Sequence, residues 1–194
     1  MALELNRLFL ALWPNAAVRD ACSDAARSLR MRMQPSGRAI PPEQFHLTLT
    51  FLGNAVDAAA ESRLRALLGQ VRVSPFRLSL DYASCFRDGA HWWLGCRHSP
   101  PELATLHIQL RDAVHRAGIT PDRARFVPHL TLQRDAGMLL PQTAVTPIGW
   151  DVESFTLARS RIDLPAPQYD QLEHWTLRAA ETAAPAGGQM PLNF

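Results

Sequence analysis

His46-Leu47-Thr48-Leu49 and His129-Leu130-Thr131-Leu132 are two copies of one tetrapeptide in this chain. Successive side chains of an extended strand point to opposite faces. Each copy therefore presents its histidine and threonine on one face and its two leucines on the other. The pattern predicts two strands that each carry a polar, reactive face above an apolar support.

The two copies lie 83 residues apart, and their surroundings are similar as well. The same offset aligns the apolar run at 7–12 with residues 90–95, and each of these is followed by proline and a helical pattern. Both halves therefore read as strand, helix and histidine-bearing strand. We interpret this as a degenerate internal repeat and expect a pseudo-two-fold site where the halves meet.

Length, charge and cysteine content limit the function classes. The chain has 194 residues, enough for one domain with a sizeable core, and a net charge of +2 that by itself does not indicate nucleic-acid binding. Its three cysteines lack metal-type spacing and favour a reducing compartment. No apolar run is long enough to span a bilayer. We therefore expect a soluble, cytoplasmic protein that does not bind membranes.

Periodicity predicts the elements of the fold. Helical spacing favours helices at 16–31, from about 57, and at 101–117. Alternating patterns favour strands at 7–12, 76–82, around 92–94, 154–160 and 169–177, with turns at 87–89 and loops at 34–38 and 141–147. The expected fold class is α+β and bilobal, with two pseudo-two-fold-related, mainly antiparallel sheets, helices packed outside and a central cleft. We expect residues 1–180 to form this single domain and 181–194 to be a disordered tail.

Two facing histidines favour acid-base chemistry. The unperturbed pKa of histidine, about 6.5, allows one ring to take a proton from a nucleophile while the other gives one to a leaving group. In-line displacement at phosphorus suits this arrangement, because Thr48 and Thr131 would hydrogen-bond the non-bridging oxygens. Neither tetrapeptide has an acidic or sulfur neighbour, so we expect no metal and no cofactor. The near symmetry leaves the acid and the base unassigned between His46 and His129.

The doubled H-x-T-x motif resembles that of the 2H phosphoesterase superfamily, in particular its RNA 2′,3′-cyclic phosphodiesterases, also called 2′-5′ RNA ligases. The similarity extends over 7–12, 45–53, 93–95, 126–132 and 155–161, with Tyr169. It implies that a terminal 2′,3′-cyclic phosphate on RNA is opened to a 2′-phosphate, with His46 as the acid at the 3′ oxygen and His129 as the base for water. Thr48 and Thr131 would then hold phosphate oxygens. Arg134 matches a family arginine near the phosphate, although strict alternation puts it on the leucine face.

The resemblance implies RNA substrates ending in a 2′,3′-cyclic phosphate, such as tRNA fragments, or small cyclic nucleotides. Two alternatives remain open: ligation or cleavage of 2′-5′ linkages by the same residues, and a non-catalytic module that binds a nucleotide or RNA end in the same cleft. A monomer is the default expectation. The remaining histidines are expected at the surface or in structural roles, and three aromatic residues are expected in the core: Phe51, Trp93 and Phe126.

Overall fold

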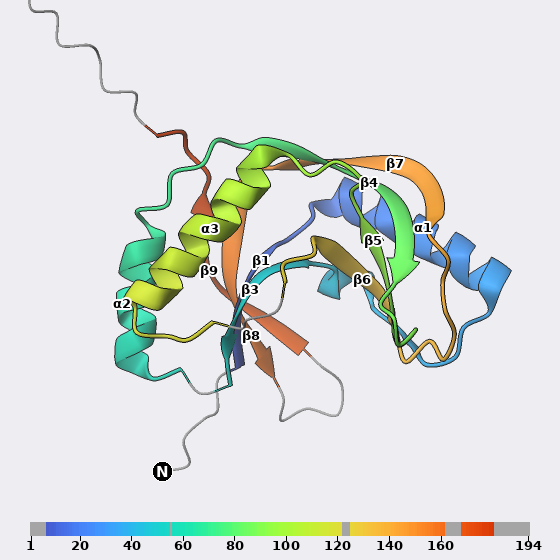
Figure 1. The fold of residues 1–194 in the computed structure, drawn as a ribbon, viewed down its shortest axis with the longest axis horizontal. Coiled ribbons are helices and arrows are strands. Elements are labelled where there is room, and N and C mark those ends of the chain that lie inside the picture. The colour runs from blue at the N-terminus through green and yellow to red at the C-terminus, as the bar shows by residue number, and fades with distance from the viewer. Residues whose placement is uncertain (1–6, 55, 122–124, 162–167, 181–194) are drawn as a thin grey trace, which may run out of the picture.

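The structure is a computed structural model that describes residues 7–54, 56–121, 125–161 and 168–180. Its helices are α1 (Ala16–Met33), α2 (Ala58–Leu68) and α3 (Pro101–Arg116), and a short 3-10 turn, η1, spans Pro42–Gln44. The strands are β1 (Arg7–Leu12), β2 (Arg38–Ala39), β3 (Leu47–Gly53), β4 (Phe76–Cys85), β5 (His91–Gly95), β6 (His129–Arg134), β7 (Thr143–Val152), β8 (Ser154–Arg161) and β9 (Gln168–Thr176). Figure 1 shows their arrangement around a curled sheet.

The two tetrapeptide strands lie at the centre of this sheet. The strand order is β7-β4-β5-β6-β3-β1-β8-β9, with β2 paired to the side of β6. All pairings are antiparallel, and β3 joins β6 through the single residue pair Leu47 and Leu130, both fully buried. The α+β class is confirmed. The expectation of two separate sheets is wrong, because this central pair joins the two four-stranded halves into one sheet.

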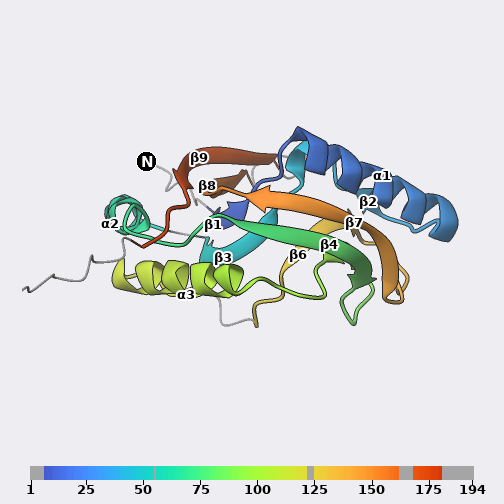
Figure 2. The ribbon, with the colours of Figure 1, turned by 90° about the horizontal axis from the view of Figure 1, so that it is seen from above.

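The predicted repeat is visible in the strand order. Outward from the centre, β6 is followed by β5 in one half and β3 is followed by β1 in the other. These are the two pairs of segments that the 83-residue offset aligns. The helices that follow β1 and β5 each pack on the opposite half of the sheet. Helix α1 follows β1 and packs against β7, and helix α3 follows β5 and packs against β3. Figure 2 shows α1 and α3 on opposite sides of the strands.

The predicted helices are confirmed, and their ends have clear local causes. The side chain of Asn15 accepts a hydrogen bond from the Val18 amide at 3.0 Å and so caps α1. Asp57 caps α2 in the same way, and Pro101 opens α3 at a position where its missing N–H costs nothing. The apolar faces that the periodicity predicted are buried against the sheet and the neighbouring helices.

Two predicted loops contain strands instead. Strand β7 covers most of 141–147, and β2 begins inside 34–38. Pro147 is tolerated because β7 is an outermost strand, where a missing amide donor need not break a ladder. Directly before β2, Gly37 has a φ of +73°, and a Cβ there would meet the backbone oxygens of Arg134 and Asp135 at 2.2 Å. Only glycine therefore lets the chain pass this close to the end of β6.

The two faces of the sheet differ in what they bury. The main core joins the leucine face of the tetrapeptides to all three helices. A second, small cluster of Phe9, Ala11 and Ala158 packs with Trp13, Phe51 and Tyr169. The histidine face therefore has an apolar floor of its own. No helix in the described ranges is both long and apolar enough to cross a membrane, and the predicted disordered tail at 181–194 lies outside those ranges.

Candidate active site

The central pairing of β3 with β6 brings the two tetrapeptides together. Because Leu47 lies opposite Leu130 in an antiparallel pair, the register places His46 beside Thr131 and Thr48 beside His129. The two histidines are then diagonal neighbours, for which typical separations are about 7 to 8 Å. All four side chains are half-buried. The halves thus contribute one histidine and one threonine each to the same small area.

Both imidazole rings are held in the same way. Nδ1 of His46 lies 2.7 Å from the carbonyl oxygen of Gln44, and Nδ1 of His129 lies 2.6 Å from that of Val127. A carbonyl oxygen only accepts, so Nδ1 carries the proton and donates it in each case. Nε2 is therefore the atom of each ring that remains to take or give a proton.

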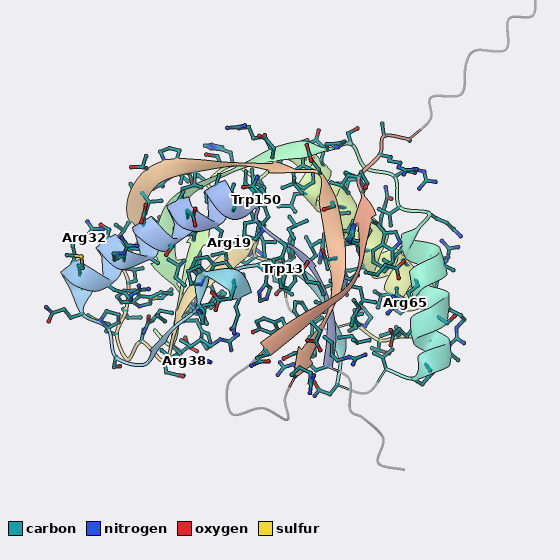
Figure 3. All side chains as sticks on the ribbon, turned by 180° about the vertical axis from the view of Figure 1, so that it is seen from behind. Trp13, Arg19, Arg32, Arg38, Arg65 and Trp150 are labelled. Atoms are coloured by element: carbon teal, nitrogen blue, oxygen red, sulfur yellow. The ribbon has the colours of Figure 1, made fainter. Side chains whose placement is uncertain are left out.

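His46 lies among three aromatic rings. Its ring stacks on Trp13 with centroids 5.0 Å apart and also contacts Phe9 and Tyr169 at 5.1 and 4.9 Å. Figure 3 shows Trp13 near the middle of the molecule, with α1 on one side and β8 and β9 on the other. Burial lowers the pKa of His46 to about 4, with smaller contributions in the same direction from Arg134 and His129, while the Gln44 carbonyl opposes the shift. The ring is therefore neutral near pH 7 when the cleft is empty.

His129 has a similar environment in the other half. Phe86 meets its ring edge-on at 5.0 Å, and Trp93 lies 6.0 Å away. Burial lowers the pKa of His129, His91 adds to this, and the hydrogen bond to Val127 acts in the opposite direction. Trp93 is buried, as predicted.

The pKa of His46 predicts a pH-dependent stability. Between pH 6.5 and about 4 the unfolded chain binds a proton at this position that the folded chain excludes, so the free energy of unfolding should decrease as pH falls through this window. The slope contributed by one such group is at most about 1.4 kcal/mol per pH unit. Urea unfolding across this range should show a shallower slope for His46→Gln than for wild type. Leu139→Ala, which changes no titratable group, is the control, and a wild-type slope in His46→Gln would contradict the assignment.

Arg134 lies on the histidine face, contrary to strict alternation. Trp92 pairs with Gln133 and Trp93 with Thr131, so Leu132 is an extra residue in β6. This bulge buries Leu132 and Gln133 in succession and returns Arg134 to the face of His129 and Thr131. One guanidinium nitrogen of Arg134 lies 3.4 Å from the Tyr169 hydroxyl, and its Nε is buried without a partner among the described residues.

The same irregularity occurs at the mirrored position of β3. Leu10 pairs with Thr50 and Ala11 with Thr48, which leaves Leu49 as the extra residue. The bulge turns Phe51 onto the histidine face, at the position that corresponds to Arg134. The two halves thus share the β-bulge, but it presents the aromatic ring of Phe51 in the half of β3 and the cation of Arg134 in the half of β6. Phe51 is half-buried beside the cleft and packs on the small cluster of Phe9, Ala11 and Ala158, not on the main core.

The cleft consists of two adjoining pockets that share Thr48 and Phe51. The pocket around His46 has a volume of about 140 Å³ and is also lined by Arg7, Phe9, Arg134, Ser160 and Tyr169. The pocket around His129 has a volume of about 160 Å³ and is also lined by Leu49, Thr50, His107, Arg111, Arg125, Phe126 and Val127. Thr131 lines neither pocket, and only its strand register places it beside His46.

Several residues of the two pockets were not predicted from the sequence. His107 was expected to be structural or at the surface, but it lines the pocket of His129, donates from Nδ1 to the Leu49 carbonyl at 2.9 Å and stacks on Phe126 with centroids 4.0 Å apart. Phe126 is half-buried there and packs against the edge of the main core. Arg7 was predicted only as part of the first strand and of the stretch 7–12 that resembles the family, and Trp13 was not predicted. Within the described ranges, no group of three or more histidine, cysteine, aspartate or glutamate side chains is placed to hold a metal ion.

A known protein family matches most of this chain. The family model of the 2′-5′ RNA ligase superfamily matches residues 18–163. The chain therefore belongs to the 2′-5′ RNA ligase superfamily, the 2H phosphoesterases, as the doubled motif indicated.

Individual relatives cover nearly the whole chain. The RNA 2′,3′-cyclic phosphodiesterase of Escherichia coli strain K12 is 35% identical over 178 residues, which cover 90% of this chain and 98% of the relative. The RNA 2′,3′-cyclic phosphodiesterase of Thermus thermophilus is 29% identical over 195 residues, which cover 94% of this chain and 96% of that relative. A crystal structure of E. coli LigT complexed with 3′-AMP superimposes with a TM-score of 0.75 at 33% identity, covering 90% of this chain and 98% of LigT.

Proposed function

We propose that this protein is an RNA 2′,3′-cyclic phosphodiesterase that hydrolyses the terminal cyclic phosphate to a 2′-phosphomonoester without a metal. Relatives with this activity match about 90% of the chain. The observation that carries the proposal is the pair of half-buried imidazoles on adjacent strands. In each ring the Nδ1–H donates a hydrogen bond to a backbone carbonyl, and Nε2 is left for proton transfer. Such a pair suits a reaction that needs a base and an acid on opposite sides of one phosphorus.

The proposed reaction uses one histidine at each end of the in-line displacement. Nε2 of His129 takes a proton from water while the water oxygen forms its bond to phosphorus. The bond from phosphorus to the 3′ oxygen breaks, and Nε2 of His46 gives that oxygen its proton. The 2′ ester bond is kept, so the product is a 2′-phosphate, and proton exchange with solvent restores both rings.

The remaining cleft residues would stabilise the charge on the phosphate. The hydroxyls of Thr48 and Thr131 lie beside the two histidines and would donate to the non-bridging oxygens. The guanidinium of Arg134 in the pocket of His46 adds a fixed positive charge. A bound phosphate anion would also raise the pKa of His46 from its low value in the empty cleft, because a nearby negative charge favours the imidazolium. Substrate binding would thereby supply the acid form that the reaction needs.

Product identification tests the proposal directly. An oligonucleotide ending in a 2′,3′-cyclic phosphate, incubated with the protein and EDTA, should yield a 2′-phosphate that phosphorus NMR distinguishes from a 3′-phosphate. A 3′-phosphate product would reverse the leaving group and overturn the roles given to the histidines. Tight nucleotide binding without turnover from pH 5 to 9 would favour the binding-module alternative.

Ligation is the second candidate, and the name of the matching family favours it. A 5′-hydroxyl oligonucleotide in place of water would be activated by His129 and would give a 2′-5′ linkage by the same displacement. Adding such an acceptor to the hydrolysis assay should convert part of the cyclic end into a longer product if the cleft admits it. A product mixture that the acceptor leaves unchanged would restrict the reaction to hydrolysis.

Arg134→Gln should reduce kcat/KM by about 10- to 100-fold, because one charge-assisted hydrogen bond to the phosphate is lost. Arg134→Lys should recover part of the loss by restoring the charge without the planar fork. Steady-state kinetics on a cyclic nucleotide measure both variants. Arg77→Gln, which removes an exposed arginine of β4, is the matched control. A wild-type kcat/KM in Arg134→Gln would exclude Arg134 from phosphate binding.

A further inference from the structure

Arg7 is a second cation in the pocket of His46. It lies at the start of β1, and its guanidinium carbon lies 4.9 Å from the centre of the Phe51 ring, which holds the side chain over the cleft. Nowhere in the described ranges does a carboxylate pair with Arg7, and no acidic residue lines this pocket. The two arginines of this pocket, Arg7 and Arg134, therefore carry more positive charge than one singly charged cyclic phosphate needs.

Arg7 also belongs to a polar row across three strands. Ser160 of β8 lies directly opposite Arg7, and Tyr169 of β9 lies directly opposite Ser160. All three side chains line the pocket. A guanidinium with a hydroxyl beside it is a donor set that suits phosphate oxygens.

The position of this row relative to His46 fits a neighbouring phosphate. Phe9, two residues after Arg7 on the same face of β1, packs against the ring of His46. Two residues along a strand advance it by about 7 Å, which is comparable to one nucleotide step of a single-stranded backbone. In the proposed reaction His46 protonates the leaving 3′ oxygen, which places the ribose of the terminal nucleotide in the pocket of His46. The 5′ oxygen of that ribose would then point toward Arg7 in the same pocket.

We propose that Arg7, together with Ser160, binds the phosphate on the 5′ side of the terminal nucleotide, so that the preferred substrate carries a second phosphate there. This inference rests on the proposed function, because it takes the position of the cyclic phosphate from it. It names the substrate class as an oligonucleotide end or a 5′-phosphorylated nucleotide, in preference to a nucleoside 2′,3′-cyclic phosphate with a free 5′-hydroxyl. It also fixes the orientation of the bound strand, with its 5′ side toward Arg7, which the near symmetry of the tetrapeptides does not determine.

The test compares adenosine 2′,3′-cyclic phosphate with and without a 5′-phosphate. Wild type should show a kcat/KM about tenfold higher or more for the 5′-phosphorylated form, the size expected of one charge-assisted contact. Arg7→Gln should bring the ratio of the two values close to one, whereas Arg77→Gln should keep the wild-type ratio. Arg134→Gln should slow both substrates together, because it acts on the shared cyclic phosphate. A wild-type ratio near one, or a ratio that Arg7→Gln leaves intact, would overturn the inference.

A binding measurement separates failure of this inference from failure of the proposed function. Calorimetric titration with adenosine 2′-phosphate and adenosine 2′,5′-bisphosphate needs no turnover and should show the same preference and the same loss in Arg7→Gln. If neither cyclic substrate is hydrolysed, the proposed function fails. The ratio of the two binding affinities still decides the inference in that case. A preference lost in Arg111→Gln but kept in Arg7→Gln would place the second phosphate on the side of His129 and contradict the inference. Thermal unfolding of each variant confirms that it is folded.

Discussion

His46→Gln and His129→Gln should each reduce kcat by about 100- to 10,000-fold, the range contributed by one general acid or base. Glutamine keeps polarity and approximate size but neither accepts nor releases a proton near neutrality. The double variant should be little slower than the slower single variant, because groups that act in one step are not additive. His98→Gln, which replaces an exposed histidine away from both pockets, should keep the wild-type rate. Wild-type turnover in both single variants would reject paired-histidine catalysis.

The pH dependence of these variants separates the acid from the base. In wild type, kcat should fall at high pH as His46 loses its proton and at low pH as His129 gains one, which gives a bell-shaped profile. The residual activity of His46→Gln should lack the alkaline limb, and that of His129→Gln should lack the acid limb. The opposite pattern would exchange the two roles.

Leu47→Ala should lower the free energy of unfolding by about 2 to 5 kcal/mol, the cost of removing a buried leucine from a packed core. Leu47 is fully buried and forms the one residue pair between β3 and β6 in the described ranges. The surrounding strands are fixed by their outer neighbours, so they cannot close around the cavity without breaking that pairing. Urea unfolding monitored by tryptophan fluorescence measures the change.

Leu139→Ala provides the matched control for this substitution. Leu139 is 61% exposed, so the same change there should alter the free energy of unfolding by less than about 0.5 kcal/mol. Leu47→Ala should also reduce turnover, because His46 and Thr48 flank the residue on the opposite face. A loss of stability at Leu47 no larger than that at Leu139 would show that the central pair does not hold the halves together.

Much of the fold could be predicted because its signals are local. The apolar periodicities of α1, α2 and α3 lie within single helices, and the helix ends follow from Asn15, Asp57 and Pro101. The repeat was visible because it has a fixed offset. Strand β7 was missed because Pro147 normally ends a strand, and only its place at the sheet edge makes the proline acceptable.

The candidate site likewise contains residues that could be predicted from local sequence and residues that could not. His107 carries no motif, yet α3 crosses to the opposite half and delivers it to the pocket of His129. Arg7 was simply the first residue of an apolar strand, and its position over the cleft depends on Phe51 of β3. Both residues reach the site through contacts between segments that are distant in the chain.

The sequence by itself determined that two histidine-threonine strands exist and which of their side chains share a face, because alternation is a property of the backbone. Only the tertiary structure decided that Arg134 joins that face and that Phe51 does so in the other half. Both depend on bulges at Leu132 and Leu49, which form where neighbouring strands of unequal register must pair. Register between strands is set by packing across the whole sheet, and no local pattern records it.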